Sequence, residues 1–456
     1  GMGRGDRQAT IEGSQPEHKR CAYKLNPGFG KRVSLMDMKY RSLARLFHAD
    51  RSVDSFNNHA ALARQRLEAD STFRTGVITP LGELFSATPR ETTLLMENIL
   101  LAERRISRLW NLIPGVMRWD YIRHSISEEL FATNEMEGVR STRKETQDAV
   151  DAADKARRDG DDSKARFSEF AKLYLNLTDK DSALPAGIAD IRDIYDKVVL
   201  DEIDESDQPD GDLFRKGDVE IQGPHGLAIH NEVKGEGNIG ALLTDMIHLA
   251  TSDEIPRLQS AIMSHFLFEY VHPFYDGNGR TGRYLLALYL NHDLTMPTVL
   301  SLSRTIAENK NAYYKAFMEA EDKLNCGELT LFVNTILGFI QQAQDELIDE
   351  LSIKVDQLDK GRILCTQLEK RHALSRNAVS VLYGVIQEEL FDSSKSMSLD
   401  EVAHHIGLSK QSARKYVEEL LAAGLVVQTG KRPLKIQVAK SLRNVLATGA
   451  DENAEA

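Results

Sequence analysis

Apolar residues recur at intervals of three and four along most of the chain, with polar residues between them. This spacing places the apolar side chains on one face of an α-helix. The segment from Arg90 to Leu112 is the clearest example, and segments 118–133, 254–270 and 307–322 follow the same rule. The pattern therefore predicts the all-α fold class.

One stretch departs from the helical pattern. Residues 216–237 are rich in glycine, contain Pro224, and place apolar residues in alternation at Leu227 and Ile229. Alternation with a period of two is typical of a strand, and glycine and proline favour turns. We expect a small β-hairpin here, set among helices.

The C-terminal part has a different order of elements. Ser398 and Glu401 have the spacing of a capping box that begins a short helix, and Gly407 would end it. A second helix is expected from Ser409 to about Ala423, followed by two strands around a turn at 429–433. Helix, turn, helix and hairpin is the order of a winged helix-turn-helix domain.

This C-terminal region is also basic. Residues 396–443 contain eight Lys or Arg and four Asp or Glu, a net charge of +4, whereas the whole chain carries −12. Winged helices contact DNA from the start of the second helix and from the wing. The candidate DNA contacts are Lys410, Gln411, Arg414, Lys415, Lys431 and Arg432. Winged helices also mediate protein contacts and oligomerisation, so that alternative stays open.

Composition sets further bounds. The chain has 456 residues, 41% hydrophobic and 28% charged, as in ordinary globular proteins of two or three domains. The net charge of −12 argues against nucleic-acid binding over the whole surface. No apolar run approaches the ~18 residues of a membrane span, and the polar start lacks the core of a signal peptide. The scattered Cys21, Cys326 and Cys365 are expected to be reduced thiols in a cytoplasmic protein.

These patterns give an expected domain order. The start, where Gly1 before Met2 has the form of a remnant of tag removal, and the end of the chain are expected to be disordered. The first helical region would be a scaffold or a homodimer surface. In order, we expect a disordered start at 1–32, a helical region at 33–117, a main domain at 118–355, a helical linker with the winged helix at 356–446, and a disordered tail at 447–456.

The residues with the most chemical content form the stretch from His272 to Arg283, HPFYDGNGRTGR. Gly277 and Gly279 allow a tight turn before an apolar helix, so free backbone N–H groups would converge at a helix N-terminus. Arg280 and Arg283 lie in the first turns, where a cation serves a bound anion better than it serves the helix. The pattern predicts a site for several phosphates, although it lacks the ending of a Walker loop.

Two further side chains fit phosphate chemistry. Asp276 would suit Mg²⁺ that bridges phosphate oxygens. His272 would act as general base toward an incoming hydroxyl, since an imidazole titrates near neutral pH. The alternative interpretation is structural, because a His before Pro and an Asp-Gly-Asn-Gly sequence often form only a turn.

This stretch resembles the Fic family signature HxFx(D/E)GNGRxxR at every fixed position. The resemblance extends over roughly residues 118–350, including 309–317 after the motif. It implies a Fic helical core with a β-hairpin flap, and transfer of AMP from ATP to a Ser, Thr or Tyr hydroxyl of a target protein. The implied metal cofactor is Mg²⁺, held by Asp276, and the implied base is His272.

The resemblance also implies roles for the other motif residues. Asn278 with the amides of Gly277 and Gly279 would cradle phosphates, Arg280 would contact the triphosphate, and Arg283 would hold the γ-phosphate. Phe274 would anchor the loop. Tyr313 would contact the nucleotide, or else pack in the core. The hairpin would bind the target by strand addition, with Ile229 and His230 at its working edge.

Upstream, the segment Thr133–Gly138 resembles the family's inhibitory signature (S/T)xxxE(G/N). The resemblance implies that Glu137 forms a bidentate pair with Arg283 and blocks the γ-phosphate. On its own, the segment would be read as a solvated acidic helix end.

Three other functions stay open. The chain could be a DNA-binding regulator whose Fic domain senses nucleotide without transferring it. It could also remove AMP from a protein, or transfer a different phosphate-containing group, although the intact Asp-Gly-Asn-Gly-Arg sequence favours AMP.

Overall fold

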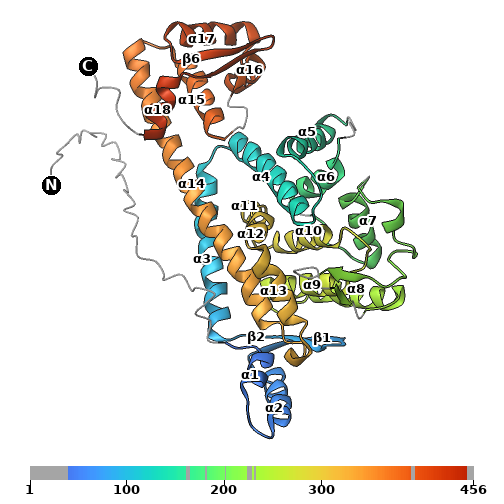
Figure 1. The fold of residues 1–456 in the computed structure, drawn as a ribbon. Coiled ribbons are helices and arrows are strands. Elements are labelled where there is room, and N and C mark those ends of the chain that lie inside the picture. The colour runs from blue at the N-terminus through green and yellow to red at the C-terminus, as the bar shows by residue number, and fades with distance from the viewer. Residues whose placement is uncertain are drawn as a thin grey trace, which may run out of the picture. The chain divides into compact units, whose positions relative to one another are not determined.

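The structure is a computed structural model that describes residues 40–160, 165–179, 182–200, 202–222, 228–230, 233–391 and 396–448. For 220–222 and 228–230 it describes the backbone alone. The expected disordered segment 1–32 lies outside the described residues, as does most of the expected tail, from 449 onward. The protein is mostly helical with few strands, which confirms the predicted fold class (Figure 1).

The region before residue 117 is not helical throughout, so that prediction was wrong in one part. Residues 72–79 and 82–87 form an antiparallel hairpin in which Thr72 pairs with Ala87 and Thr79 with Gly82. The first strand is rich in β-branched residues, which favour strands, and Pro80 lies in its turn. The elements here are α1 (Leu43–Ala49), α2 (Ser55–Leu67), β1 (Thr72–Thr79), β2 (Gly82–Ala87) and α3 (Arg90–Leu112).

The central region contains the elements that build the site. Helix α9 was expected to bury one face, but nearly all of its residues are buried because α8, α10 and α14 all pack against it. The elements are α4 (Gly115–Met136), α5 (Arg143–Asp159), α6 (Ser168–Asn176), α7 (Ile188–Val198), η2 (Glu205–Asp207), β3 (Glu220–Gln222), β4 (Ala228–His230), α8 (Glu236–Ala250), α9 (Arg257–Val271), α10 (Asn278–Leu290), α11 (Met296–Val299), α12 (Leu302–Glu308), α13 (Lys310–Ala320) and η4 (Lys323–Asn325).

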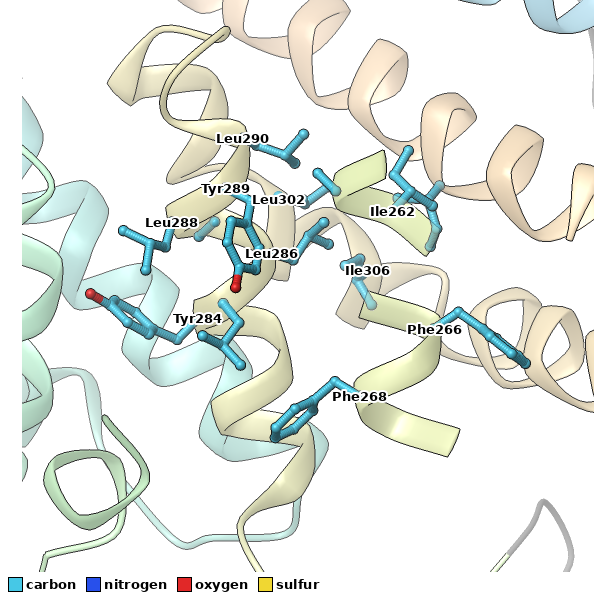
Figure 2. Packing of buried hydrophobic residues seen from close by; sticks show 14 of the residues in the cluster. Ile262, Phe266, Phe268, Tyr284, Leu286, Leu288, Tyr289, Leu290, Leu302 and Ile306 are labelled. Carbon is cyan, nitrogen blue, oxygen red and sulfur yellow. The ribbon is translucent and has the colours of Figure 1, made fainter. Parts of the chain in front are cut away.

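Apolar side chains from three of these helices meet in the main core. Figure 2 shows Phe266 and Phe268 from α9, Leu286 from α10, and Leu302 and Ile306 from α12 in one cluster. All five are at most 4% exposed. This close packing fixes the C-terminal end of α9 against the N-terminal end of α10, which is where the motif lies.

Helix α14 (Thr330–His372) is a single helix of 43 residues. It lies alongside α3 (Figure 1). It runs without a break through residue 355, where the sequence analysis ended the main domain. The helix expected at 307–322 is present as α13, which begins at Lys310, because residues 307 and 308 belong to the end of α12.

The C-terminal elements occur in the order expected, and their arrangement is compatible with a winged helix. The capping box is present, with the Ser398 N–H donating to Glu401 Oε2 at 2.6 Å and Gly407 ending the helix in the left-handed conformation. Strand β5 and helix α18 were not predicted. The elements are α15 (Arg376–Phe391), β5 (Met397–Ser398), α16 (Leu399–Ile406), α17 (Lys410–Ala422), β6 (Val426–Lys431), β7 (Leu434–Val438) and α18 (Lys440–Thr448), with sheet order β5-β7-β6.

Among the described helices, none combines the length and the apolar character that crossing a membrane requires.

Candidate active site

The motif occupies a tight loop that joins α9 to α10. His272 ends α9 in the left-handed conformation, at φ 50°. Phe274 is fully buried and stacks on Tyr195, with ring centroids 3.5 Å apart, so it anchors the loop as expected. The Asn278 side chain closes the loop, because Oδ1 accepts from the Phe274 N–H at 3.0 Å and Nδ2 donates to the Phe274 carbonyl at 2.8 Å.

This geometry gives Asn278 a different task from the one that the resemblance implied. Both polar ends of its side chain are used within the loop, so Asn278 shapes the loop. Gly277 has φ 79°, and a Cβ there would lie 2.5 Å from Val199 Cγ1. A Cβ on Gly279 would lie 2.2 Å from Glu137 Oε1. Gly277 is therefore required by its left-handed conformation, whereas a Cβ on Gly279 would displace the Glu137 carboxylate.

Arg280 is fully buried, and none of its three guanidinium nitrogens has a hydrogen-bond partner among the described residues. Burial lowers the pKa of its guanidinium. A buried cation without a partner is costly, and the group lies in the first turn of α10, which favours anions. The carboxylates of Asp276 and Glu137 oppose this fall in the pKa of Arg280, but burial outweighs them. Arg280 thus provides unused donors for an anion at this helix end.

Arg283 is buried, and its Nε and Nη2 both donate hydrogen bonds. Its Nε donates to Thr133 Oγ1 at 2.8 Å, and its Nη2 donates to the Thr133 carbonyl at 3.1 Å and to Glu137 Oε1 at 2.7 Å. The contact with Glu137 is therefore single rather than bidentate, because Thr133 takes part of the guanidinium fork. Burial would raise the pKa of Glu137, but Arg283 outweighs it and holds that pKa below its usual range.

His272 is partly buried. Burial, and next the positive charge of Arg215, lower the pKa of His272 to about 4. The imidazole is therefore neutral at neutral pH and able to accept a proton. Glu137 and Asp276 act in the opposite direction, but more weakly.

Arg215 holds the backbone of this loop, a role that was not predicted from the sequence. Its Nε donates to the His272 carbonyl at 2.7 Å. A buried arginine is rare unless it is paired. In the sequence, Arg215 stands beside Lys216 before the glycine-rich hairpin, and this pattern does not separate a buried arginine from a solvated one.

Asp276 is exposed beside the loop, and its Oδ1 accepts from the Gly277 N–H at 2.6 Å. The described residues contain no cluster of three or more His, Cys, Asp or Glu side chains suited to a metal ion. One carboxylate fits Mg²⁺ only where phosphates and water supply the other ligands.

Two tyrosines of α13 lie at different depths. Tyr313 is 2% exposed and its hydroxyl is 2.8 Å from His265 Nε2, so it occupies the core position that was its alternative role. Tyr314 is partly exposed and interacts electrostatically with Glu137 and Arg283. Tyr314, which the sequence analysis did not select, is therefore the tyrosine nearer the surface of the site.

Glu269 is a second acidic group at the site that was not selected. Its Oε1 has no hydrogen-bond partner among the described residues. Burial raises the pKa of Glu269 to about 8, and Glu137 adds to the rise, whereas Arg283 opposes it. Glu269 is therefore mostly protonated and uncharged at neutral pH, so Glu137 is the carboxylate that pairs with Arg283.

The predicted hairpin is present as β3 and β4, with Glu220 opposite His230 and Ile221 opposite Ile229. The side chains of Ile229 and His230 lie outside the described part of the structure.

The six candidate DNA contacts of the C-terminal region are all exposed. Lys410 pairs with Asp400 at 2.7 Å, which leaves its ammonium group less available for a DNA phosphate than the other basic side chains. The exposed residues are Lys410, Gln411, Arg414 and Lys415 on α17, and Lys431 and Arg432 at the β6–β7 turn.

Comparison with known proteins identifies the central region. Residues 185–290, which include the whole motif, match the model of the Fic/DOC family. The chain contains a Fic domain. The match ends before the C-terminal elements and begins after Glu137, so it covers the Fic domain without the α4 helix or the C-terminal module.

Solved Fic structures resemble longer parts of the chain at low identity. A Fic family protein from Desulfovibrio desulfuricans G20 is 18% identical, with a TM-score of 0.44, and the match covers 78% of this chain and 97% of that one. A Fic domain containing signaling protein from Bacteroides thetaiotaomicron is 17% identical, with a TM-score of 0.38 and coverage of 57% and 95%. Fic-1 from C. elegans is 15% identical, with a TM-score of 0.42 and coverage of 68% and 81%.

Proposed function

We propose that this chain transfers AMP from ATP to a hydroxyl group of a target protein, and that Glu137 restrains the reaction. The observation that carries the proposal is the buried Arg280 in the first turn of α10, which has no hydrogen-bond partner among the described residues, in the same motif as a neutral His272. In the reaction, the target hydroxyl oxygen bonds to the α-phosphorus, the bond to pyrophosphate breaks, and His272 takes the hydroxyl proton.

The donors at the N-terminus of α10 suit a polyphosphate. Arg280 would bind it with donors that have no other partner, and Arg283 would bind it after Glu137 leaves. The exposed Asp276 would hold Mg²⁺ with the phosphates, and the ion would neutralise charge on them. A carboxylate already lies where an anion would bind, since Glu137 Oε1 approaches both Gly279 and Arg283.

The position of Glu137 supports a restraint on ATP binding. It caps the end of α4, and Lys310 Nζ donates to the Met136 carbonyl at 2.8 Å, which fixes that end. A phosphate at Arg283 would meet the Glu137 carboxylate, and two anions in a partly buried site repel strongly.

The test uses ATP labelled on the α-phosphate, with Mg²⁺ and cell lysate. We expect strong protein labelling by Glu137→Gly, weak labelling by the wild type and none by Glu137→Gly/His272→Ala. Absence of label from Glu137→Gly would overturn AMP transfer. Loss of label from a previously modified protein would then point to AMP removal.

A second candidate function is DNA binding by the C-terminal module, and the Fic domain would then sense nucleotide. The exposure of Gln411, Arg414 and Lys415 along one helix favours it. The test is a titration of labelled duplex DNA with wild type and Arg414→Ala/Lys415→Ala at two salt concentrations. DNA binding is expected to weaken with the double change and with salt. Equal binding by both proteins would exclude this surface.

A further inference from the structure

Arg215 is fully buried, and among the residues that the structure describes it forms no ion pair with a carboxylate, although the charge of Asp218 acts on it more weakly than burial does. Its guanidinium donates to four backbone carbonyls instead. Burying a cation without a counter-ion is unfavourable, and it persists only where many hydrogen bonds satisfy the group. Arginine suits this task because its fork holds five N–H donors in fixed directions.

Two of the four carbonyls belong to the catalytic loop. Arg215 Nε donates to the His272 carbonyl at 2.7 Å, and Nη2 donates to the Val271 carbonyl at 3.1 Å. The Arg215 backbone N–H also donates to the Pro273 carbonyl, at 3.1 Å. Three consecutive carbonyls around the proposed base are therefore held by this one residue.

The other two carbonyls lie at the base of the flap. Nη1 donates to the Gly217 carbonyl at 2.7 Å, and Nη2 donates to the Val233 carbonyl at 3.1 Å. Because Glu220 pairs with His230, Gly217 and Val233 are equally far along the two arms of the hairpin. One guanidinium thus joins both arms of the flap to the backbone of His272.

We propose that Arg215 is a positioning residue that sets the flap, and any target strand docked on it, at a fixed distance from the His272 imidazole. The effect of Arg215 on the transfer rate, which is the catalytic part of this inference, rests on the proposed AMP transfer. The link that Arg215 makes between the flap and the loop, which is the mechanical part, does not. A misplacement of about 1 Å between reacting groups lowers rates by roughly 100-fold. The hydrogen bonds of Arg215 to the flap and the loop therefore matter more for transfer than for nucleotide binding.

Hydrogen exchange of the full chain tests the mechanical part. We compare wild type with Arg215→Lys, which keeps the charge but loses the fork, and with Arg215→Met. Peptides covering Gly217, Val233 and 271–277 are expected to exchange faster together, by about tenfold, with α3 and α14 unchanged. The control is Arg192→Met, since Arg192 Nη1 donates to the nearby Leu213 carbonyl at 2.9 Å without touching loop or flap. Faster exchange in only the loop or only the flap would overturn the proposal.

Transfer assays in the Glu137→Gly background test the catalytic part. Both Arg215 variants are expected to lose roughly 100-fold in transfer while ATP affinity changes less than about threefold. Their pH profiles should differ. With Met, the loss of positive charge beside His272 leaves Asp276 as the facing charge and moves the acid limb to higher pH, whereas Lys keeps it in place. Transfer by Arg215→Lys at the parental rate would contradict the proposal. No transfer by the parent would overturn the proposed function, and hydrogen exchange would still decide the role of Arg215.

Discussion

Arg283 Nη2 lies 2.7 Å from Glu137 Oε1, and the two residues are 146 positions apart in the chain. The Arg283 side chain is 2% exposed and the Glu137 side chain 23%, so solvent reaches the pair from the side of Glu137. This relationship ties the end of α4 to the first turns of the motif helix. The first two predictions concern substitutions that weaken this contact in different ways.

Glu137→Gln keeps the volume of the side chain and removes its charge. Without a carboxylate beside Arg283, ATP affinity should rise about tenfold, which corresponds to roughly 1.4 kcal/mol. The measurement is ATP binding by calorimetry. Glu135→Gln is the matched control, because Glu135 is on the same helix but exposed. If both variants bind ATP like the wild type, the charge of Glu137 does not oppose ATP.

Lys310→Ala removes the hydrogen bond to the Met136 carbonyl at the end of α4. One such bond contributes about 1 kcal/mol, so the end of α4 should detach from α13 about fivefold more often. The rate of AMP transfer should rise by a similar factor. The rate of label transfer measures this. Lys315→Ala is the control, since Lys315 lies on the same helix and, among the described residues, forms an ion pair with Glu319 alone, at 3.9 Å. Equal rates for the two variants would show that Lys310 does not restrain α4.

Arg280→Met should stabilise the protein while abolishing its use of ATP. Replacing a buried, unpartnered cation by an apolar side chain of similar length relieves a desolvation cost of about 1 kcal/mol or more. The two measurements are the free energy of unfolding in denaturant and ATP binding. A variant that is less stable and still binds ATP would mean that Arg280 has a structural partner instead of a ligand.

Glu269→Gln should change the pH dependence of stability. Folding raises the pKa of Glu269 from 4.5 to about 8, so its stabilising contribution is complete below pH 4.5 and is lost as pH rises through about 8. Relative to wild type, the Gln variant should therefore gain Tm at pH 8.5 compared with pH 5.5. Glu129, whose pKa burial raises to about 7, keeps the same trend in both proteins. A Tm difference that does not vary with pH would contradict the assignment.

Much of the local structure could be predicted because it depends on neighbours along the chain. The helix at Arg90–Leu112, the capping box at Ser398 and the hairpin within 216–237 follow from periodicity and turn chemistry. The hairpin at 72–87 was missed because a short β-branched run was outweighed by the helical pattern around it.

The sequence by itself determined the helical class and the resemblance of the 272–283 motif to the Fic family. Only the tertiary structure decided which charges meet. It paired Arg283 with Glu137 and left Arg280 without a hydrogen-bond partner among the described residues. It also used the Asn278 side chain within the loop, buried Tyr313 more deeply than Tyr314, and bonded Arg215 to the His272 carbonyl. Periodicity encodes which face of a helix is buried, whereas the partner of a buried polar group depends on how distant segments pack, and local pattern carries no information on that.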